Sequence, residues 1–143
     1  MPRYFTLLEA EALLPEVERL LTKLIQLRRD YESADRQLAQ ISQKIALSGG
    51  MAVSGEQIRE IRSRKDRSAR EMQEAMEDIQ RTGCLLKDIE TGLIDFPTLY
   101  RDREVYLCWK LGESGISFWH QIADGFRGRQ GIDSEFLANH RGE

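Results

Sequence analysis

The chain has 143 residues, of which 41% are hydrophobic and 31% charged, and its formal net charge is −3. These values are typical of a globular domain with a charged helical surface, and they exclude a largely disordered chain. A strongly basic surface marks most nucleic-acid binders, so the acidic balance does not favour that class. The two cysteines, Cys84 and Cys108, are too few for a disulfide framework or, by themselves, for a zinc site.

The N-terminal residues lead directly into a charged helical pattern, without an apolar segment of signal-peptide length. Uninterrupted apolar runs are a few residues long, far short of the roughly 20 residues that span a bilayer. We therefore expect a cytoplasmic protein that does not associate with membranes.

The first predicted helix begins with a capping box, in which Thr6 and Glu9 bond reciprocally to free N–H groups. Pro15 lacks the donor that a helix interior needs, so we expect a break or kink near this residue. Further apolar residues recur alternately three and four positions apart, namely Val17, Leu20, Leu24, Leu27, Tyr31, Ala34, Leu38, Ile41 and Ile45. This spacing predicts a long helix with a coiled-coil-like seam that ends near Leu47.

A second helix is predicted after a glycine-containing turn at residues 48–54, where another capping box restarts the helical pattern. Its seam consists of Ile58, Ile61, Lys65, Ser68, Met72, Ala75 and Ile79. Because the connection is short, the two helices should lie antiparallel, with Ile45 near Ile58 and Tyr31 near Met72.

Residues 6–82 are therefore predicted to form one long antiparallel helical hairpin. A second apolar line lies beside the seam and contains Leu21, Ile25, Ala69 and Met76. Two helices alone cannot bury so wide an apolar face, so we expect a partner hairpin, the C-terminal module or both to cover it.

The stretch of residues 59–70 contains six cationic and two acidic side chains. One interpretation is a phosphate-binding surface, and the other is a solvated helix face paired with acids of the first helix. The second is favoured because acids lie beside the arginines and no aromatic residue is interleaved. Nucleic acid is therefore not an expected partner.

From residue 83 the hydrophobic period changes from helical to alternating. Residues 84–89 and 92–97 predict two short strands joined by a turn, and Pro97 should end the second because proline cannot donate to a ladder. Residues 104–110 predict a third strand, whose alternate side chains face opposite sides of a sheet.

Residues 83–130 are thus expected to form a small antiparallel β-sheet module, followed by a flexible tail over residues 131–143. The predicted fold is mainly α with a small β part (α+β). It consists of a long antiparallel coiled-coil-like helical hairpin followed by this module, in a single domain over residues 1–143.

Several segments of the C-terminal half have distinctive amino-acid sequences, namely 91–97 (TGLIDFP), 105–113 (VYLCWKLGE), 118–120 (FWH) and 125–130 (GFRGRQ). Together with the opening residues 5–17, they resemble an uncharacterised bacterial family catalogued as domain of unknown function 2203. The resemblance spans nearly the whole chain. It implies one unit from about residue 5 to residue 130, and it implies no activity.

The candidates for metal chemistry are Cys108, Glu113 and His120, because thiolate, carboxylate and imidazole together are zinc ligands. Asp88 and Asp95 could face this group from neighbouring strands. The spacing matches no standard zinc motif, and no other cofactor is expected. The alternative is a packed His120 that bonds to backbone or to Glu113, with Cys108 simply buried.

The candidates for ligand binding are Glu113, Trp119, His120, Arg127 and Arg129. Aromatic walls with cationic groups would suit an anion. The same aromatic residues could instead fill the core, which is their commoner role. No nucleophile–base pair is recognisable, so the sequence favours a non-enzymatic role.

The sequence thus favours a small protein–protein interaction or scaffolding protein that forms a homodimer through its helical hairpin and binds an unidentified protein partner. The alternative is a ligand- or metal-binding domain, or an enzyme, with a site around Glu113, Trp119 and His120.

Overall fold

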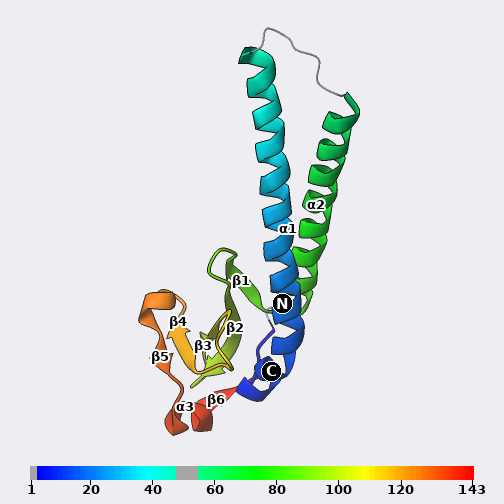
Figure 1. The fold of residues 1–143 in the computed structure, drawn as a ribbon. Coiled ribbons are helices and arrows are strands. Elements are labelled where there is room, and N and C mark those ends of the chain that lie inside the picture. Colours follow the sequence, from blue (N-terminus) through cyan, green and yellow to red (C-terminus); the bar gives the residue numbers. More distant parts are fainter. Residues whose placement is uncertain (1–2, 48–54) are drawn as a thin grey trace. The chain divides into compact units, whose positions relative to one another are not determined.

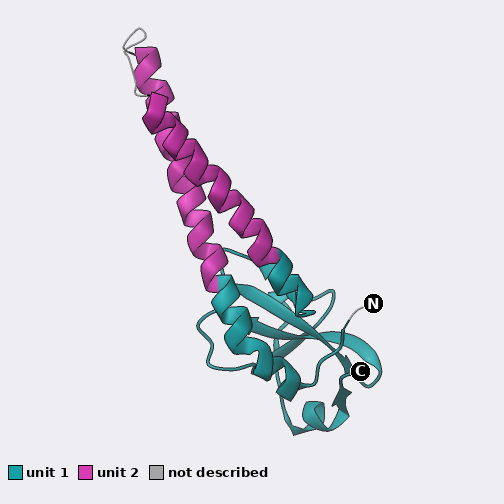
Figure 2. Cartoon of the chain, turned by 90° about the vertical axis from the view of Figure 1, so that its right-hand side faces the viewer, with its two compact units in different colours: residues 1–21, 77–143 teal, residues 22–76 magenta. Residues whose placement is uncertain are grey.

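The computed structural model describes residues 3–47 and 55–143, so the turn expected at 48–54 lies outside the described residues. The chain forms two compact units, residues 1–21 with 77–143 and residues 22–76 (Figure 2). Helices α1 (Leu7–Leu47) and α2 (Gly55–Arg81) each contribute to both units, and the strands follow them in the chain (Figure 1). This confirms a mainly α fold with a helical hairpin followed by an antiparallel sheet.

The start of α1 is held by the predicted capping box. The Thr6 N–H donates to the Glu9 carboxylate at 2.9 Å, and the Glu9 N–H donates to the Thr6 hydroxyl at 3.1 Å. The Leu7 N–H donates to Nε2 of His140, at 3.0 Å. Side chains therefore satisfy helix N–H groups that have no partner within the helix.

Pro15 lies inside α1, which is continuous from Leu7 to Leu47, and the expected break is not present. The Pro15 ring is exposed, whereas Leu14 and Val17 on either side of it are buried. A proline in a helix costs about 3 kcal/mol. The burial of apolar side chains on both sides of Pro15 outweighs this cost, so the helix continues.

Within the unit of residues 22–76, α1 and α2 lie side by side as an antiparallel pair. The Lys65 ammonium lies 2.8 Å from the Asp35 carboxylate and 5.3 Å from the centre of the Tyr31 ring. Lys65, the charged residue of the seam, is thus paired with an acidic side chain at the edge of the helix interface. The buried seam residues of this unit include Leu24, Leu27, Ala34, Ile61, Ser68 and Ala75.

The sheet belongs to the other unit and contains six strands, with every neighbouring pair antiparallel. The strands are β1 (Leu85–Asp88), β2 (Leu93–Tyr100), β3 (Arg103–Lys110), β4 (Phe118–Gln121), β5 (Gln130–Gly131) and β6 (His140–Arg141). Strands β1 to β5 follow one another in space, and β6 pairs with β2. A short 3-10 helix, η1 (Phe126–Gly128), precedes β5.

Pro97 does not end its strand, because β2 continues to Tyr100. The Pro97 carbonyl accepts the Phe5 N–H at 2.8 Å, on the side of β2 that faces away from β3. A missing N–H on that side removes no bond to β3, since both backbone groups of a strand residue point the same way. Strand β1 pairs with the start of β2 and β6 with its end, and Pro97 lies between them.

The last residues are packed and do not form the expected flexible tail. They include α3 (Ser134–Asn139) and β6. The Phe136 ring is 1% exposed, and it stacks on Trp119 and Tyr100 with ring centres 5.0 and 4.8 Å apart. The buried Phe136 ring therefore holds the C-terminus to the sheet.

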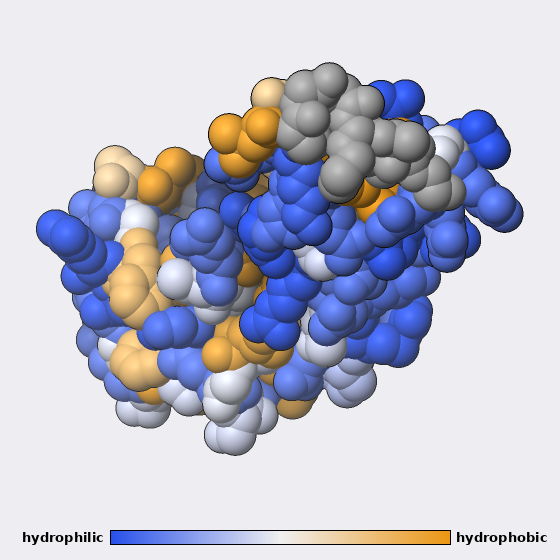
Figure 3. Space-filling model, turned by 45° about the horizontal axis from the view of Figure 1, so that its top comes forward, coloured by the Kyte–Doolittle hydropathy of each residue, from blue (hydrophilic) through white to orange (hydrophobic). Residues whose placement is uncertain are grey.

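The two faces of the sheet differ in character. One face carries the apolar core of its unit, where Phe5 meets Phe96 edge to face with ring centres 5.4 Å apart. The other face carries Asp95, Cys108 and His120 of β2, β3 and β4, together with apolar residues such as Leu93 and Phe118. On the molecular surface seen in Figure 3, hydrophilic residues predominate. Among the described residues, no helix combines the length and apolar character needed to cross a bilayer.

Candidate metal centre

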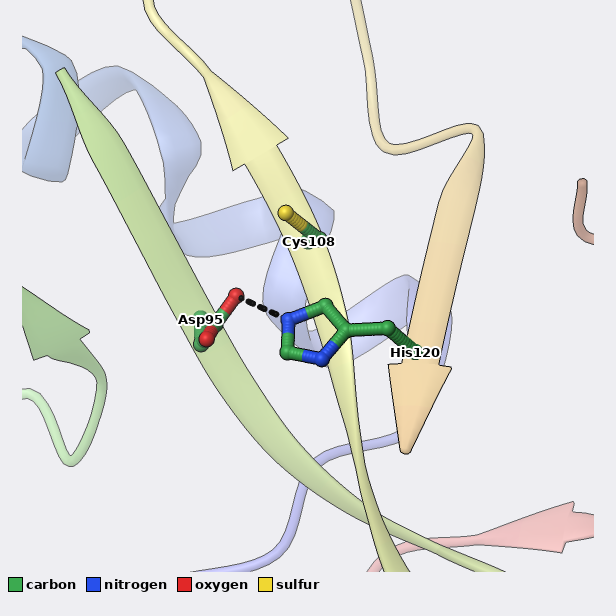
Figure 4. A group of neighbouring side chains, drawn as sticks. All are labelled: Asp95, Cys108 and His120. Carbon is green, nitrogen blue, oxygen red and sulfur yellow. Dashed lines mark hydrogen bonds and ion pairs between the residues drawn. The ribbon is translucent and has the colours of Figure 1, made fainter. Parts of the chain in front are cut away.

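Three adjacent strands bring Asp95, Cys108 and His120 together on the face of the sheet opposite the Phe96 core (Figure 4). Asp95 of β2 is the direct cross-strand partner of Cys108 of β3. His120 of β4 lies opposite Tyr106, two residues along β3 from Cys108. Since side chains two residues apart share a face, all three point to the same side. The sheet register therefore creates the group.

His120 has a defined orientation. Its Nδ1 lies 2.7 Å from the Gln121 carbonyl oxygen, and its Nε2 lies 3.1 Å from Oδ1 of Asp95. A carbonyl oxygen can only accept, so Nδ1 carries a proton and donates it. The contact between Nε2 and Asp95 then requires one further proton between them. The His120 and Asp95 side chains are only 3% and 4% exposed, so this proton is shielded from water.

Cys108 completes the group. One potential ligand atom from each residue lies within 4.8 Å of the other two. Burial, followed by the negative charge of Asp95, raises the pKa of the Cys108 thiol to about 12. At neutral pH the sulfur therefore remains a thiol when no cation is bound. This argues against Cys108 as an unassisted nucleophile, because the thiolate is the reactive form.

A cavity of about 160 Å³ opens beside the three side chains. Its lining includes the apolar side chains of Leu93, Ile122 and Phe126, and also Tyr106 and Lys87. Lys87 lies where the β1–β2 register shifts, and its ammonium is 5.0 Å from the centre of the Tyr106 ring. A mostly apolar hollow with a few convergent polar groups is typical of small-molecule and cofactor sites.

The three side chains fit a zinc-type ion. Zinc binds thiolate, imidazole and carboxylate at about 2.0–2.3 Å, which places tetrahedral ligand atoms about 3.3–3.8 Å from each other. The distance of 3.1 Å between Asp95 and His120 is close to this value. Ligand atoms of the group that lie as far as 4.8 Å apart would have to move about 1 Å closer to each other to bind the ion. Metal-binding histidines usually donate their second N–H to a carbonyl or carboxylate. The bond from His120 to Gln121 has this form.

Glu113 lies apart from the group, although it was a predicted ligand. Its carboxylate receives two short contacts from Arg129, of 2.7 and 2.8 Å, and accepts the Lys110 N–H at 2.7 Å. Its carbonyl oxygen accepts the Trp109 indole N–H at 3.0 Å. These bonds give Glu113 a structural role in the turn after β3. Of the three predicted ligands, the structure brings Cys108 and His120 together and adds Asp95.

The predicted ligand-binding residues do not converge on one pocket. Trp119 precedes His120 in β4 and therefore faces the opposite side of the sheet, where it stacks on Phe136. Arg127 is exposed, in η1. Arg129 lies over the Phe118 ring, 4.0 Å from its centre, and does not line the cavity. Only His120 of the predicted set borders the cavity.

The sequence suggested Asp95, together with Asp88, only as a residue that could face the group, and it was not one of the three predicted ligands. The strand alternation predicted that Cys108 faces away from Trp109, but not which residue of β2 lies beside it. That pairing depends on the register between β2 and β3 and on the length of their turn.

Comparison with known proteins places the chain in a family. No curated protein and no solved structure matches it. A family model described as an uncharacterized conserved protein, DUF2203, matches residues 3–132. This range contains both helices, the site and strands β1 to β5, and the chain therefore belongs to the DUF2203 family.

Proposed function

We propose that this protein binds a divalent transition-metal ion of the zinc type through Asp95, Cys108 and His120. The observation that carries the proposal is the burial of carboxylate, thiol and imidazole groups on one sheet face, all within 4.8 Å of one another. Such groups are costly to bury without strong partners. A cation would stabilise the thiolate and the carboxylate at once.

The arrangement provides three protein ligands and one open direction. Structural zinc sites usually have four protein ligands, whereas catalytic sites have three and leave a position for water or substrate. Here the cavity beside Cys108 and His120 provides room for that fourth donor. The proposal therefore favours an open site that binds a small ligand, and a bound zinc ion would supply Lewis-acid chemistry there.

The competing explanation is a buried ion pair between His120 and Asp95 that only supports the fold. Such a pair would satisfy both side chains through the 3.1 Å contact and the bond to Gln121. This ion pair would not require a thiol beside it, because an apolar side chain would fill the position of Cys108 equally well. The two explanations differ in whether the purified chain binds metal.

Calorimetric titration of the metal-free chain with Zn²⁺ tests the proposal. We expect one ion per chain, with binding weakened more than tenfold by Asp95→Asn and by His120→Gln. The Cys84→Ser variant is the matched control, because Cys84 is also buried but bonds to Thr82 and Ile79 outside the group. Absence of stoichiometric binding, or equal weakening by Cys84→Ser, would contradict the proposal.

A second proposed function is self-association through the helical hairpin, as expected from the sequence. Within residues 22–76, a hollow on the hairpin is lined by Tyr31, Ala69, Met72, Gln73 and Met76. The described residues of this unit form two helices, which supply no second layer to cover such a face. We propose that the hairpin of a second copy covers it, as in a four-helix arrangement.

Sedimentation equilibrium tests this second function. We expect a dimer at micromolar concentration that dissociates in a Met72→Glu/Met76→Glu variant, with Glu74→Gln/Glu77→Gln as a control on the same helix. A monomer at every concentration would contradict it. Either function fits the cytoplasm, where the thiols of Cys84 and Cys108 stay reduced.

A further inference from the structure

Helix α2 carries an unusual charged surface in the unit of residues 22–76. Four exposed arginines of this helix, here called the arginine stripe, are Arg59, Arg62, Arg67 and Arg70. They line one hollow, together with Ser63 and Asp66. At about 100° of rotation per residue, these four side chains occupy one side of the helix. The surface is distinct from the metal centre, which belongs to the other unit.

The side of α2 that carries the stripe faces solvent. Arg64 and Lys65 point the other way, because they bond to Gln37 and Asp35 of α1 at 2.5 and 2.8 Å. The buried residue Ile61 also lies on that inner side. The stripe is therefore available to another molecule.

Among the residues that the structure describes, no ion pair or hydrogen bond joins a member of the stripe to an acidic side chain, although the Asp66 carboxylate lines the same hollow and lowers its net positive charge. The sequence suggested that acids of α1 would neutralise these arginines. Those acids have other partners in the structure: Lys65 for Asp35, Arg28 for Glu32 and Gln26 for Asp30. The four members of the stripe are therefore solvated, as one interpretation of the sequence expected, but they are not paired with these acids of α1.

We propose that the arginine stripe binds the phosphate backbone of double-stranded nucleic acid without reading its sequence. Guanidinium groups bind phosphate oxygens in a bidentate manner. From Arg59 to Arg70 the helix rises about 16 Å, and a duplex presents roughly ten phosphates over that axial length. Only four of these phosphates need to face the helix for each member of the stripe to bind a separate one.

The composition of this face argues for a duplex over other polyanions. None of the residues that line the hollow is aromatic, so it lacks the aromatic side chains on which proteins that bind single strands usually stack bases. It also offers no large apolar side chain that could enter a membrane interface. Because the whole chain has a net charge of −3, we expect weak and strongly salt-dependent binding.

Fluorescence anisotropy with a labelled DNA duplex of mixed sequence tests the inference on the full chain. Each phosphate contact contributes a slope of about −0.9 to the dependence of log K on log salt. Four contacts predict a slope of about −3.6, and the Arg62→Gln/Arg67→Gln variant should reduce its magnitude by about 1.8.

The matched control is Arg29→Gln/Arg36→Gln, which removes the same charge from exposed positions of α1 in the same unit. The inference requires this variant to keep the full slope. Circular dichroism checks that both variants remain helical.

Three outcomes would overturn the inference. One is the absence of binding at low salt, and another is an equal change of slope in both variants. The third is binding to phosphatidylserine vesicles without binding to the duplex, which would assign the stripe to a membrane surface instead.

Discussion

Nε2 of His120 lies 3.1 Å from Oδ1 of Asp95, although the two residues belong to strands that are not neighbours. Strand β3 lies between β2, which carries Asp95, and β4, which carries His120. Strands two apart in a sheet are separated by about 9.6 Å. The two side chains must therefore reach toward each other over β3, where Cys108 lies. This geometry directs imidazole, carboxylate and thiol to one point and is the basis of the proposed metal centre.

The pair of Asp95 and His120 should be sensitive to the loss of one partner. In the metal-free chain, Asp95→Asn should lower the free energy of unfolding by about 1–3 kcal/mol, because the buried His120 imidazole loses the carboxylate to which it bonds. Replacing both residues, in Asp95→Val/His120→Leu, should recover most of that loss. Urea unfolding measures both effects, and an additive loss in the double variant would count against a coupled pair.

Glu113 should matter for stability and not for metal binding. The Glu113→Gln variant weakens the pair with Arg129, whose side chain is only 12% exposed, and should cost about 1–3 kcal/mol in urea unfolding. The Zn²⁺ affinity of the folded variant should stay unchanged. A loss of zinc binding would instead place Glu113 among the ligands.

Phe136 should anchor the C-terminal residues. We expect Phe136→Ala to lower the free energy of unfolding by about 3–5 kcal/mol, because the ring is buried against Trp119 and Tyr100. The neighbouring Leu137 is 46% exposed, so Leu137→Ala is a matched control that should have little effect. Thermal or urea denaturation compares the two variants, and equal stability in both would support a loosely attached tail.

Pro15 should destabilise the helix in which it lies. Since α1 is continuous through this exposed position, Pro15→Ala should raise the free energy of unfolding by about 1–3 kcal/mol. Denaturant titration monitored by circular dichroism measures the change. A destabilised Pro15→Ala variant would indicate that the proline fixes a necessary local geometry.

The sequence was sufficient to predict the hairpin and the alternation of the third strand. Spacings of three and four residues identify a helix face without knowledge of its partner, so the antiparallel pairing around Tyr31 and Met72 followed directly. In β3, the alternation of side chains along a strand likewise predicted that Cys108 and Trp109 face opposite sides of the sheet.

Other features depend on neighbours that are distant in the chain. Pro97 is tolerated because its missing N–H faces away from β3, and no local pattern reveals that side. Phe136 is an anchor only because Tyr100 and Trp119 lie beside it. The third member of the site, Asp95, likewise depends on strand order and register, which local propensity does not determine.

Titration of the metal-free protein with Co²⁺ tests the proposed centre most directly, because a bound thiolate gives an intense sulfur-to-metal charge-transfer absorption. We expect this band in the unmodified chain and in Cys84→Ser, saturating at one Co²⁺ per chain, and we expect Cys108→Ser to lack it. The proposed centre would be contradicted if the unmodified chain showed no band, or if the band persisted in Cys108→Ser.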